Sequence, residues 1–188
     1  MNQLCFIGDL GLCVYESEAS GIKNIKGVMP YIAPELFIGG GYSQQSDIYA
    51  FGMIMWEISS GKKAFHETVH DKELALRIFN GLRPAFTDDT PQFYKDLMRK
   101  CWNADPTERP SAEEIYELFN GWTTCPSQEI KEQLDKAEQI RKHALTIKRE
   151  PPIQHPGAIY TSHLMPNISK GKQLLLVVLY KCIKISLI

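Results

Sequence analysis

The 188-residue sequence has no long hydrophobic run and no excess of charge of either sign. Its longest apolar stretch, residues 174–180, falls far short of the roughly 20 residues that a membrane-spanning helix needs. The 21 basic and 22 acidic residues give a net charge of −1, so the chain has no bulk attraction to nucleic acid or anionic membranes. With 44% hydrophobic residues, wholesale disorder is excluded as well. We therefore expect a folded protein without a transmembrane segment and without a nucleic-acid partner.

Disulfide and redox motifs are also missing from the sequence. The five cysteines form no C-x-x-C pair, and their number is odd. The first residues lack the basic and apolar regions that open a secretory signal peptide. Together these absences predict reduced thiols in an intracellular, cytoplasmic protein.

Helical periodicity dominates the sequence after residue 42. Apolar spacing predicts helices over about 46–60 and 71–80, and a charged amphipathic helix over 127–149. Before them, residues 4–7 are typical of a short strand, and the glycines and prolines of 12–42 favour loops. The sequence therefore predicts a mainly α fold.

Two further helices are predicted from their N-terminal signals. One begins at Pro91, with Thr90 as its N-cap, and its apolar stripe reaches Cys101. The other begins at Ser111, and Glu114 stands three residues later. This spacing predicts a capping box, in which hydroxyl and carboxylate bind the free N–H groups of the first turn.

The predicted helix 46–60 is apolar on every side. A helix of this kind is expected to be buried all round, so it needs neighbours on several sides. Few other helices are predicted in the sequence, and we therefore expect the fold to require more chain than these 188 residues.

Five short motifs occur in a fixed order along residues 4–122: Asp9-Leu10-Gly11, Ala33-Pro34-Glu35, Ser46-Asp47-Ile48-Tyr49-Ala50-Phe51-Gly52, Cys101-Trp102 and Arg109-Pro110. In this order they resemble the C-terminal lobe of a eukaryotic protein kinase, most closely the tyrosine-kinase-like serine/threonine group. The resemblance implies a truncated kinase domain over 1–122, followed by a charged amphipathic helix over 123–150. An irregular, proline-containing and partly apolar tail is expected over 151–188.

The resemblance also implies roles for residues near the start of the chain. Asp9 would bind the Mg²⁺ that bridges the phosphates of ATP, with Leu10 and Gly11 completing this cofactor-binding motif. Residues 9–35 would form the activation segment, whose candidate phosphorylation sites are Tyr15, Ser17 and Ser20.

Three residues receive structural roles from the same resemblance. Glu35 is expected to pair with Arg109 and so to tie the activation segment to the helical core. Asp47 is expected to accept backbone N–H bonds from the catalytic loop. A simpler role for Asp47, capping the N-terminus of its own helix, also remains open.

Several parts that protein kinases need are absent from the sequence. It contains no G-x-G-x-x-G loop and no H-R-D, and only eight residues precede Asp9. Val28 stands where serine/threonine kinases have a threonine, and it lacks the hydroxyl that would reach the catalytic aspartate. We therefore predict that the chain belongs to an ATP- and Mg²⁺-dependent kinase acting on protein hydroxyls, but that these residues alone are inactive.

Two other functions remain open on the sequence. A kinase-like remnant could present its helices, or the helix 127–149, to a partner protein. The run His66-Glu67-Thr68-Val69-His70 matches the H-E-x-x-H pattern of zinc hydrolases, with His143 or His155 as a third ligand. That chemistry requires a helix, whereas this run is expected in a loop between two helices. It is therefore the remote alternative.

The end of the chain, residues 166–188, is apolar, uncharged in its centre and prone to form β-structure. Two interpretations are open: a weak anchor on a membrane surface, or translated non-coding sequence. We favour the second, which predicts that deleting 166–188 improves solubility and leaves stability unchanged.

Overall fold

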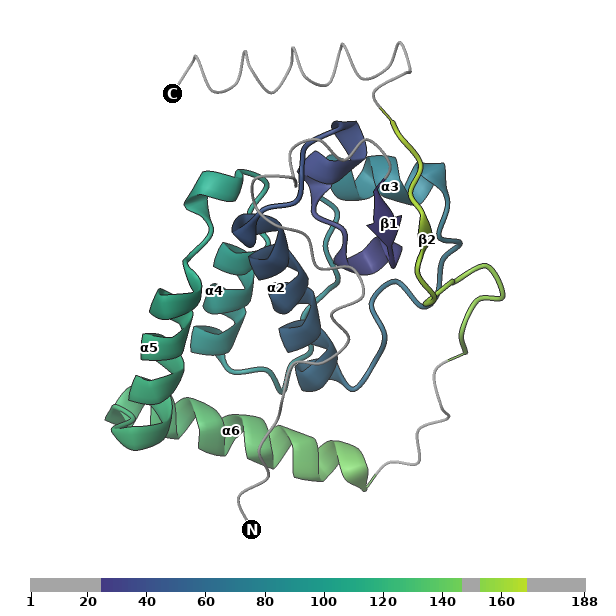
Figure 1. The fold of residues 1–188 in the computed structure, drawn as a ribbon. Helices are drawn as coiled ribbons and strands as arrows, with labels where there is room; N and C mark the ends of the chain where they lie inside the picture. The colour runs from purple at the N-terminus through teal and green to yellow at the C-terminus, as the bar shows by residue number, and fades with distance from the viewer. Residues whose placement is uncertain (1–24, 147–152, 169–188) are drawn as a thin grey trace, which may run out of the picture.

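The computed structural model describes residues 25–146 and 153–168 of the chain (Figure 1). This part is mostly helical, as predicted, with the α-helices α2 (Gln44–Ser60), α3 (Lys72–Phe79), α4 (Gln92–Cys101), α5 (Ala112–Thr124) and α6 (Gln128–Leu145). Short 3-10 helices are η2 (Met29–Tyr31), η3 (Pro34–Ile38) and η4 (Pro106–Glu108). The strands β1 (Lys26–Gly27) and β2 (His163–Leu164) form a small antiparallel pair. No helix of the described part is long and apolar enough to cross a membrane.

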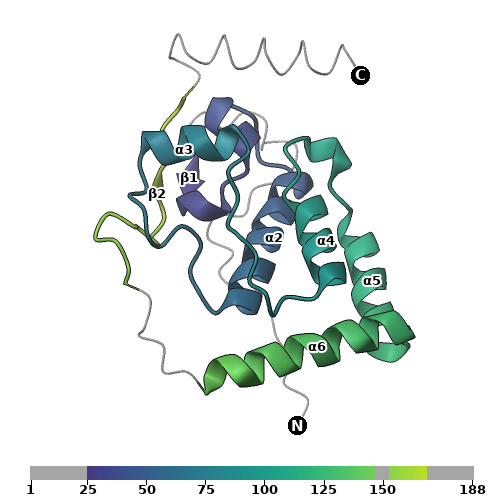
Figure 2. The same cartoon turned by 180° about the vertical axis from the view of Figure 1, so that it is seen from behind.

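The core is built around α2, which packs against α4, η2 and η4. Its side chains Tyr49, Met53 and Met55 are almost completely buried. At Gly52 an added Cβ atom would lie 2.8 Å from the Cβ of Cys101, so the glycine permits the close approach of α2 and α4. The two helices lie side by side in both views of the molecule (Figure 2).

On one face of α2, two large apolar side chains are exposed in the part of the chain that the structure describes. Ile54 is 45% exposed and Ile58 is 74% exposed, although they lie on the same helix as the buried residues. The sequence predicts burial on every side, and this face departs from that prediction. The sequence pattern shows that a helix needs neighbours, but it does not show whether neighbours are present.

The helix N-termini follow the predicted signals closely, although α2 begins at Gln44, two residues before the predicted start, and α4 is also shifted. Ser111 and Glu114 form the predicted capping box of α5, with bonds of 3.1 and 2.7 Å. The start of α4 lies one residue later than predicted, because Pro91 takes the N-cap position. Thr90 is buried, and its hydroxyl bonds to that of Thr87 at 2.8 Å instead of capping the helix.

After α5 the chain turns into α6, which lies across one end of the other helices (Figure 1). Gln133 of α6 accepts the backbone N–H of Phe93, at the start of α4, at 3.1 Å. The predicted helix 127–149 is therefore present, with its described part ending at Leu145.

Residues 153–168, which we call the return segment, run back along the side of the molecule that holds β1 and α3 (Figure 1). Met165 and Ile168 are buried in the same core as the helices, at 7% and 3% exposure. The backbone N–H of Ile168 also bonds to the carbonyl of Phe37 at 3.0 Å. A deletion from residue 166 would remove these contacts of Ile168. These contacts argue against the prediction that such a deletion leaves stability unchanged, and a measurement of the shortened chain decides it.

Candidate functional site

The main feature of the candidate site is an ion pair between Glu35 and the buried Arg109. Both terminal nitrogens of Arg109 bind the carboxylate, Nη1 to Oε1 at 2.7 Å and Nη2 to Oε2 at 2.8 Å. The Arg109 side chain has no exposed surface, and its other bonds reach the carbonyls of Gln45 and Asn103 at 2.8 and 3.0 Å. Planar, two-point contacts of this kind are strong and fix orientation. The pair joins η3 to the segment after η4, over 74 residues of sequence.

A second arginine, the partly buried Arg83, also packs near Tyr49. The guanidinium groups of Arg83 and Arg109 lie 5.0 and 5.3 Å from the centroid of this ring. Arg83 donates two bonds to the carbonyl of Trp102, at 3.0 and 2.9 Å. Burial lowers the pKa of Arg83 and raises the pKa of the fully buried Tyr49. The sequence analysis missed Arg83, because a single arginine after a helix end belongs to no pattern or motif.

Asp47 lies in the first turn of α2 and does not cap the helix. The N-cap is Ser43, which forms a capping box with Ser46. The alternative in which Asp47 caps its own helix is therefore wrong. Within the described residues, no donor hydrogen-bonds to the Asp47 carboxylate, and packing around it raises its pKa through desolvation.

The residues before Glu35 lie over the start of α2. A cavity of about 480 Å³ lies there, and Val28, Asp47 and Tyr160 are among the residues that line it. Tyr31 of η2 donates its hydroxyl to Glu57 at 2.8 Å, and burial together with this bond raises the pKa of Tyr31 above its usual range. The Tyr31–Glu57 bond links η2 to the C-terminal part of α2.

The H-E-x-x-H run lies in turns between α2 and α3, as expected, and not on a helix. The His66 and His70 rings make hydrogen bonds within the fold. Nδ1 of His66 lies 2.9 Å from the Lys63 carbonyl, and Nε2 of His70 lies 3.2 Å from the Phe65 carbonyl. No group of three metal-binding side chains converges anywhere in residues 25–146 and 153–168. The geometry that zinc hydrolysis requires is therefore not formed by the described residues.

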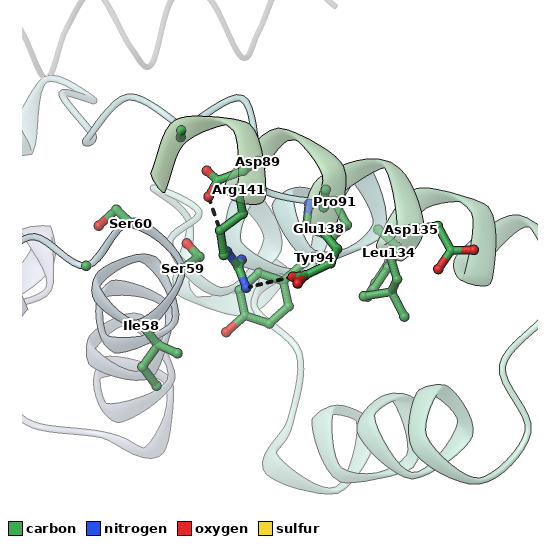
Figure 3. Close-up of a pocket in the computed structure, with 14 residues that line it drawn as sticks. Ile58, Ser59, Ser60, Asp89, Pro91, Tyr94, Leu134, Asp135, Glu138 and Arg141 are labelled. Carbon is green, nitrogen blue, oxygen red and sulfur yellow. Dashed lines mark hydrogen bonds and ion pairs between the residues drawn. The ribbon is translucent and has the colours of Figure 1, made fainter. Parts of the chain in front are cut away.

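A larger groove, of about 1050 Å³, lies between α6, the end of α2 and the start of α4 (Figure 3). Ile58 of α2, Tyr94 of α4 and Leu134 of α6 are among the residues that line this groove. Arg141 of α6 forms ion pairs there with Asp89 at 3.4 Å and with Glu138 at 3.9 Å. The groove thus combines apolar side chains with carboxylates, of which Asp89 and Glu138 are paired with Arg141.

The family model for "Protein tyrosine and serine/threonine kinase" matches residues 1–119, which is more than half of the chain. The chain belongs to this protein kinase family. Its fold is that of a kinase C-lobe fragment, as the motifs predicted, and it is mainly helical.

Individual kinases are similar to parts of the chain. Mitogen-activated protein kinase kinase kinase 7 of Bos taurus is 36% identical over 99 residues, which cover 52% of this chain and 17% of that protein. A probable LIM domain-containing serine/threonine-protein kinase of Dictyostelium discoideum is 38% identical over 89 residues, covering 47% and 14%. The solved AtMLKL3 tetramer matches 63% of this chain and 25% of its own at 24% identity, with a TM-score of 0.44. The chain spans less than a fifth of the length of these two curated relatives.

In a kinase, the residues expected to bind Mg²⁺ and ATP stand in the first part of this sequence. Asp9, Leu10 and Gly11 lie outside the described residues, as do the candidate phosphorylation sites Tyr15, Ser17 and Ser20. The described part of the site therefore consists of Glu35, Asp47 and Arg109, together with the cavity beside Val28.

Proposed function

We propose that the chain is part of the C-lobe of a serine/threonine kinase, the lobe that binds the protein substrate. The complete kinase would transfer a phosphoryl group from ATP to protein hydroxyls. We further propose that the 188 residues alone do not catalyse this transfer. The observation that supports the first proposal is the buried two-point pair of Glu35 and Arg109 within a chain of the kinase family. The second proposal follows from the missing G-x-G-x-x-G and H-R-D motifs.

The ion pair would provide a fixed support for a protein substrate. It holds η3 against the core, and η2 and β1 precede η3 directly in the sequence. Since Arg109 is fully buried, water does not compete for its bonds to Glu35. The segment 25–35 can therefore keep its position while a bound substrate chain moves beside it.

Asp47 would bind a part of the kinase domain other than the described residues. Its carboxylate is partly desolvated and has no described hydrogen-bond donor. A carboxylate in this state gains most from backbone N–H donors. We therefore propose that Asp47 accepts backbone N–H bonds from the catalytic loop of the kinase domain and so holds that loop in position.

Asp9 would hold Mg²⁺ beside Leu10 and Gly11, because carboxylate oxygen is the ligand that this hard cation prefers. The bound metal would neutralise charge on the phosphates of ATP. Val28 lacks the hydroxyl found at this position in related kinases. We propose that this reduces activity even in a complete kinase domain, and that Tyr15, Ser17 and Ser20 are sites of regulatory phosphorylation.

The purified chain, free of other kinases, tests this proposal with radiolabelled ATP and a basic protein substrate. We expect no transfer above that of the Asp9→Ala variant. A chimera that adds the missing N-terminal half from mitogen-activated protein kinase kinase kinase 7 should transfer label, and Glu35→Ala in the chimera should abolish the transfer. Label transfer by the unmodified chain would contradict the second proposal, and a folded but inactive chimera would contradict the first.

An interaction module is the second candidate function, and the groove beside α6 favours it. Ile58 is 74% exposed there, next to the carboxylates Asp89 and Glu138. Such a groove suits a partner helix with an apolar face. This alternative predicts partner binding that ATP does not change and that Ile58→Asp abolishes. Binding that survives Ile58→Asp would contradict it.

A further inference from the structure

The groove beside α6 has an apolar part that the described residues leave open to solvent. Ile58 is 74% exposed and Leu134 is 44% exposed, and both line the groove of about 1050 Å³ together with Tyr94. The three side chains come from α2, α6 and α4 (Figure 3). Exposed aliphatic side chains gain free energy when an apolar group covers them, so the groove favours an occupant with aliphatic residues.

The polar side of the groove carries an excess of negative charge. The described residues that line it include three carboxylates, Asp89, Asp135 and Glu138, and the guanidinium of Arg141. Arg141 pairs with Asp89 at 3.4 Å and with Glu138 at 3.9 Å. Lys142 also reaches Glu138, at 3.6 Å, whereas Asp135 has no ion-pair partner among the described residues. Asp135 is therefore available to a cationic group of an occupant.

One segment of this chain has the matching composition. Residues 169–188, which we call the terminal segment, contain four lysines and no acidic residue. Because the whole chain has a net charge of −1, the rest of the chain carries a net charge of −5. Two of the lysines, Lys181 and Lys184, stand beside the aliphatic residues Ile183 and Ile185. The terminal segment is thus basic and apolar while the rest of the chain is acidic, and these opposite charges favour contact between them.

The terminal segment is long enough to reach the groove. It follows Ile168, whose backbone N–H bonds to the carbonyl of Phe37 in η3 at 3.0 Å. This element lies near the start of α2, since the guanidinium of Arg109 bonds to both elements. The groove lies at the other end of α2, whose 17 residues extend over about 26 Å. About ten extended residues span about 33 Å, so residues 179–188 can lie in the groove.

We propose that the groove beside α6 is the binding site of the chain's own terminal segment. In the bound state, residues 179–188 cover Ile58 and Leu134 with aliphatic side chains, and a lysine of the segment pairs with Asp135. This role is an alternative to a membrane-surface anchor and to translated non-coding sequence. It differs from the second candidate function in its occupant, because an external partner would first have to displace the segment. The proposal is independent of phosphoryl transfer, so its test needs no ATP.

Cross-linking of the unaltered chain with a water-soluble carbodiimide tests the proposal. The reagent joins a lysine amine to a carboxylate where the two groups are in contact, and peptide mass mapping identifies the pair. We expect Lys181 or Lys184 to be joined to Asp135 within monomeric protein. Links spread equally over exposed carboxylates such as Glu113 and Glu117 of α5 would overturn the proposal. Links found only between two molecules would overturn it as well, because they would place the segment on a second copy.

Alkylation of the native Cys182 is a second measurement, and it requires no cross-link. Docking shields this thiol, so a change at Ile58, which the segment covers, should make it accessible. Ile58→Asn alters a side chain that is 74% exposed and lines the groove, and the control Tyr116→Asn alters one that is 69% exposed on α5. Because both side chains are largely exposed, we expect both variants to fold.

The reagent is iodoacetamide, and the rates are followed by peptide mass mapping. We expect Cys182 to react about tenfold faster in Ile58→Asn than in the unaltered chain or Tyr116→Asn, the factor that corresponds to losing one buried aliphatic side chain. Cys125 is exposed and lies outside the groove, so it should react equally in all three proteins. A Cys182 rate that is the same in all three would refute the docking of the terminal segment.

Discussion

The buried pair of Glu35 and Arg109 permits a quantitative test by the substitution Glu35→Ala. In the variant the guanidinium of Arg109 stays buried, with no exposed side-chain surface, and loses the two bonds of 2.7 and 2.8 Å. Removing one partner of a buried ion pair costs about 3–5 kcal/mol, because the other charge remains desolvated and unpaired. This is a large share of a typical free energy of unfolding of about 5–15 kcal/mol.

Urea denaturation followed by tryptophan fluorescence measures this loss. With a urea dependence of about 2 kcal/mol per molar, a loss of 3–5 kcal/mol lowers the midpoint by about 1.5–2.5 M. The carbonyls of Gln45 and Asn103 still accept bonds from Arg109, so we expect a value near the lower end.

The control is an exposed ion pair of nearly equal length. Arg99 and Asp96 are 2.6 Å apart, but their side chains are 49% and 54% exposed. Exposed pairs contribute only about 0.2–1 kcal/mol, and salt screens them. By the same conversion, Asp96→Ala should therefore shift the midpoint by about 0.1–0.5 M, at most about a third of the Glu35→Ala effect. Equal shifts for the two variants would refute the reasoning from burial.

Three further predictions concern packing, reactivity and capping. Gly52→Ala should destabilise the protein by about 1–3 kcal/mol in the same denaturation assay, because the new Cβ would lie 2.8 Å from the Cβ of Cys101. At Gly121 in α5 an added Cβ meets nothing within 4 Å, so Gly121→Ala should stabilise the protein by about 0.5–1 kcal/mol. Burial raises the pKa of Cys101 to about 12, so iodoacetamide at pH 8 should label the exposed Cys125 at least tenfold faster, as peptide mass mapping would show; equal rates would contradict the buried position. Ser111→Ala removes the N-cap of α5 and should cost about 1 kcal/mol in thermal unfolding, and an unchanged melting temperature would contradict the cap.

Much of the local structure can be read from neighbouring residues. The capping box of α5 follows from the spacing of Ser111 and Glu114, since both groups act within one turn. The order of short motifs is sufficient to indicate the family, and the family implies the pairing of Glu35 with Arg109. One shift, at Thr90, arose because the hydroxyl found a partner in Thr87 instead of the helix.

The remaining features depend on segments that are distant in the sequence. The return segment binds through backbone groups, which every residue carries, so no pattern of side chains marks His70 and Ile159 as partners. The H-E-x-x-H run suggests a metal site in the sequence, but in the fold its residues form hydrogen bonds with the return segment. Likewise, the apolar residues of α2 require burial, but Ile58 remains 74% exposed because coverage depends on which elements lie beside it.

The amino-acid order therefore establishes the helices, their caps and the kinase family, because these arise from short-range periodicity and from motifs of a few residues. The burial of Arg109, the exposed face of α2 and the strand added to β1 come from tertiary contacts. The Arg109 pair and the added strand join segments more than 70 residues apart in the sequence. Residue spacing and composition describe only near neighbours, so they do not show which distant segments will be in contact.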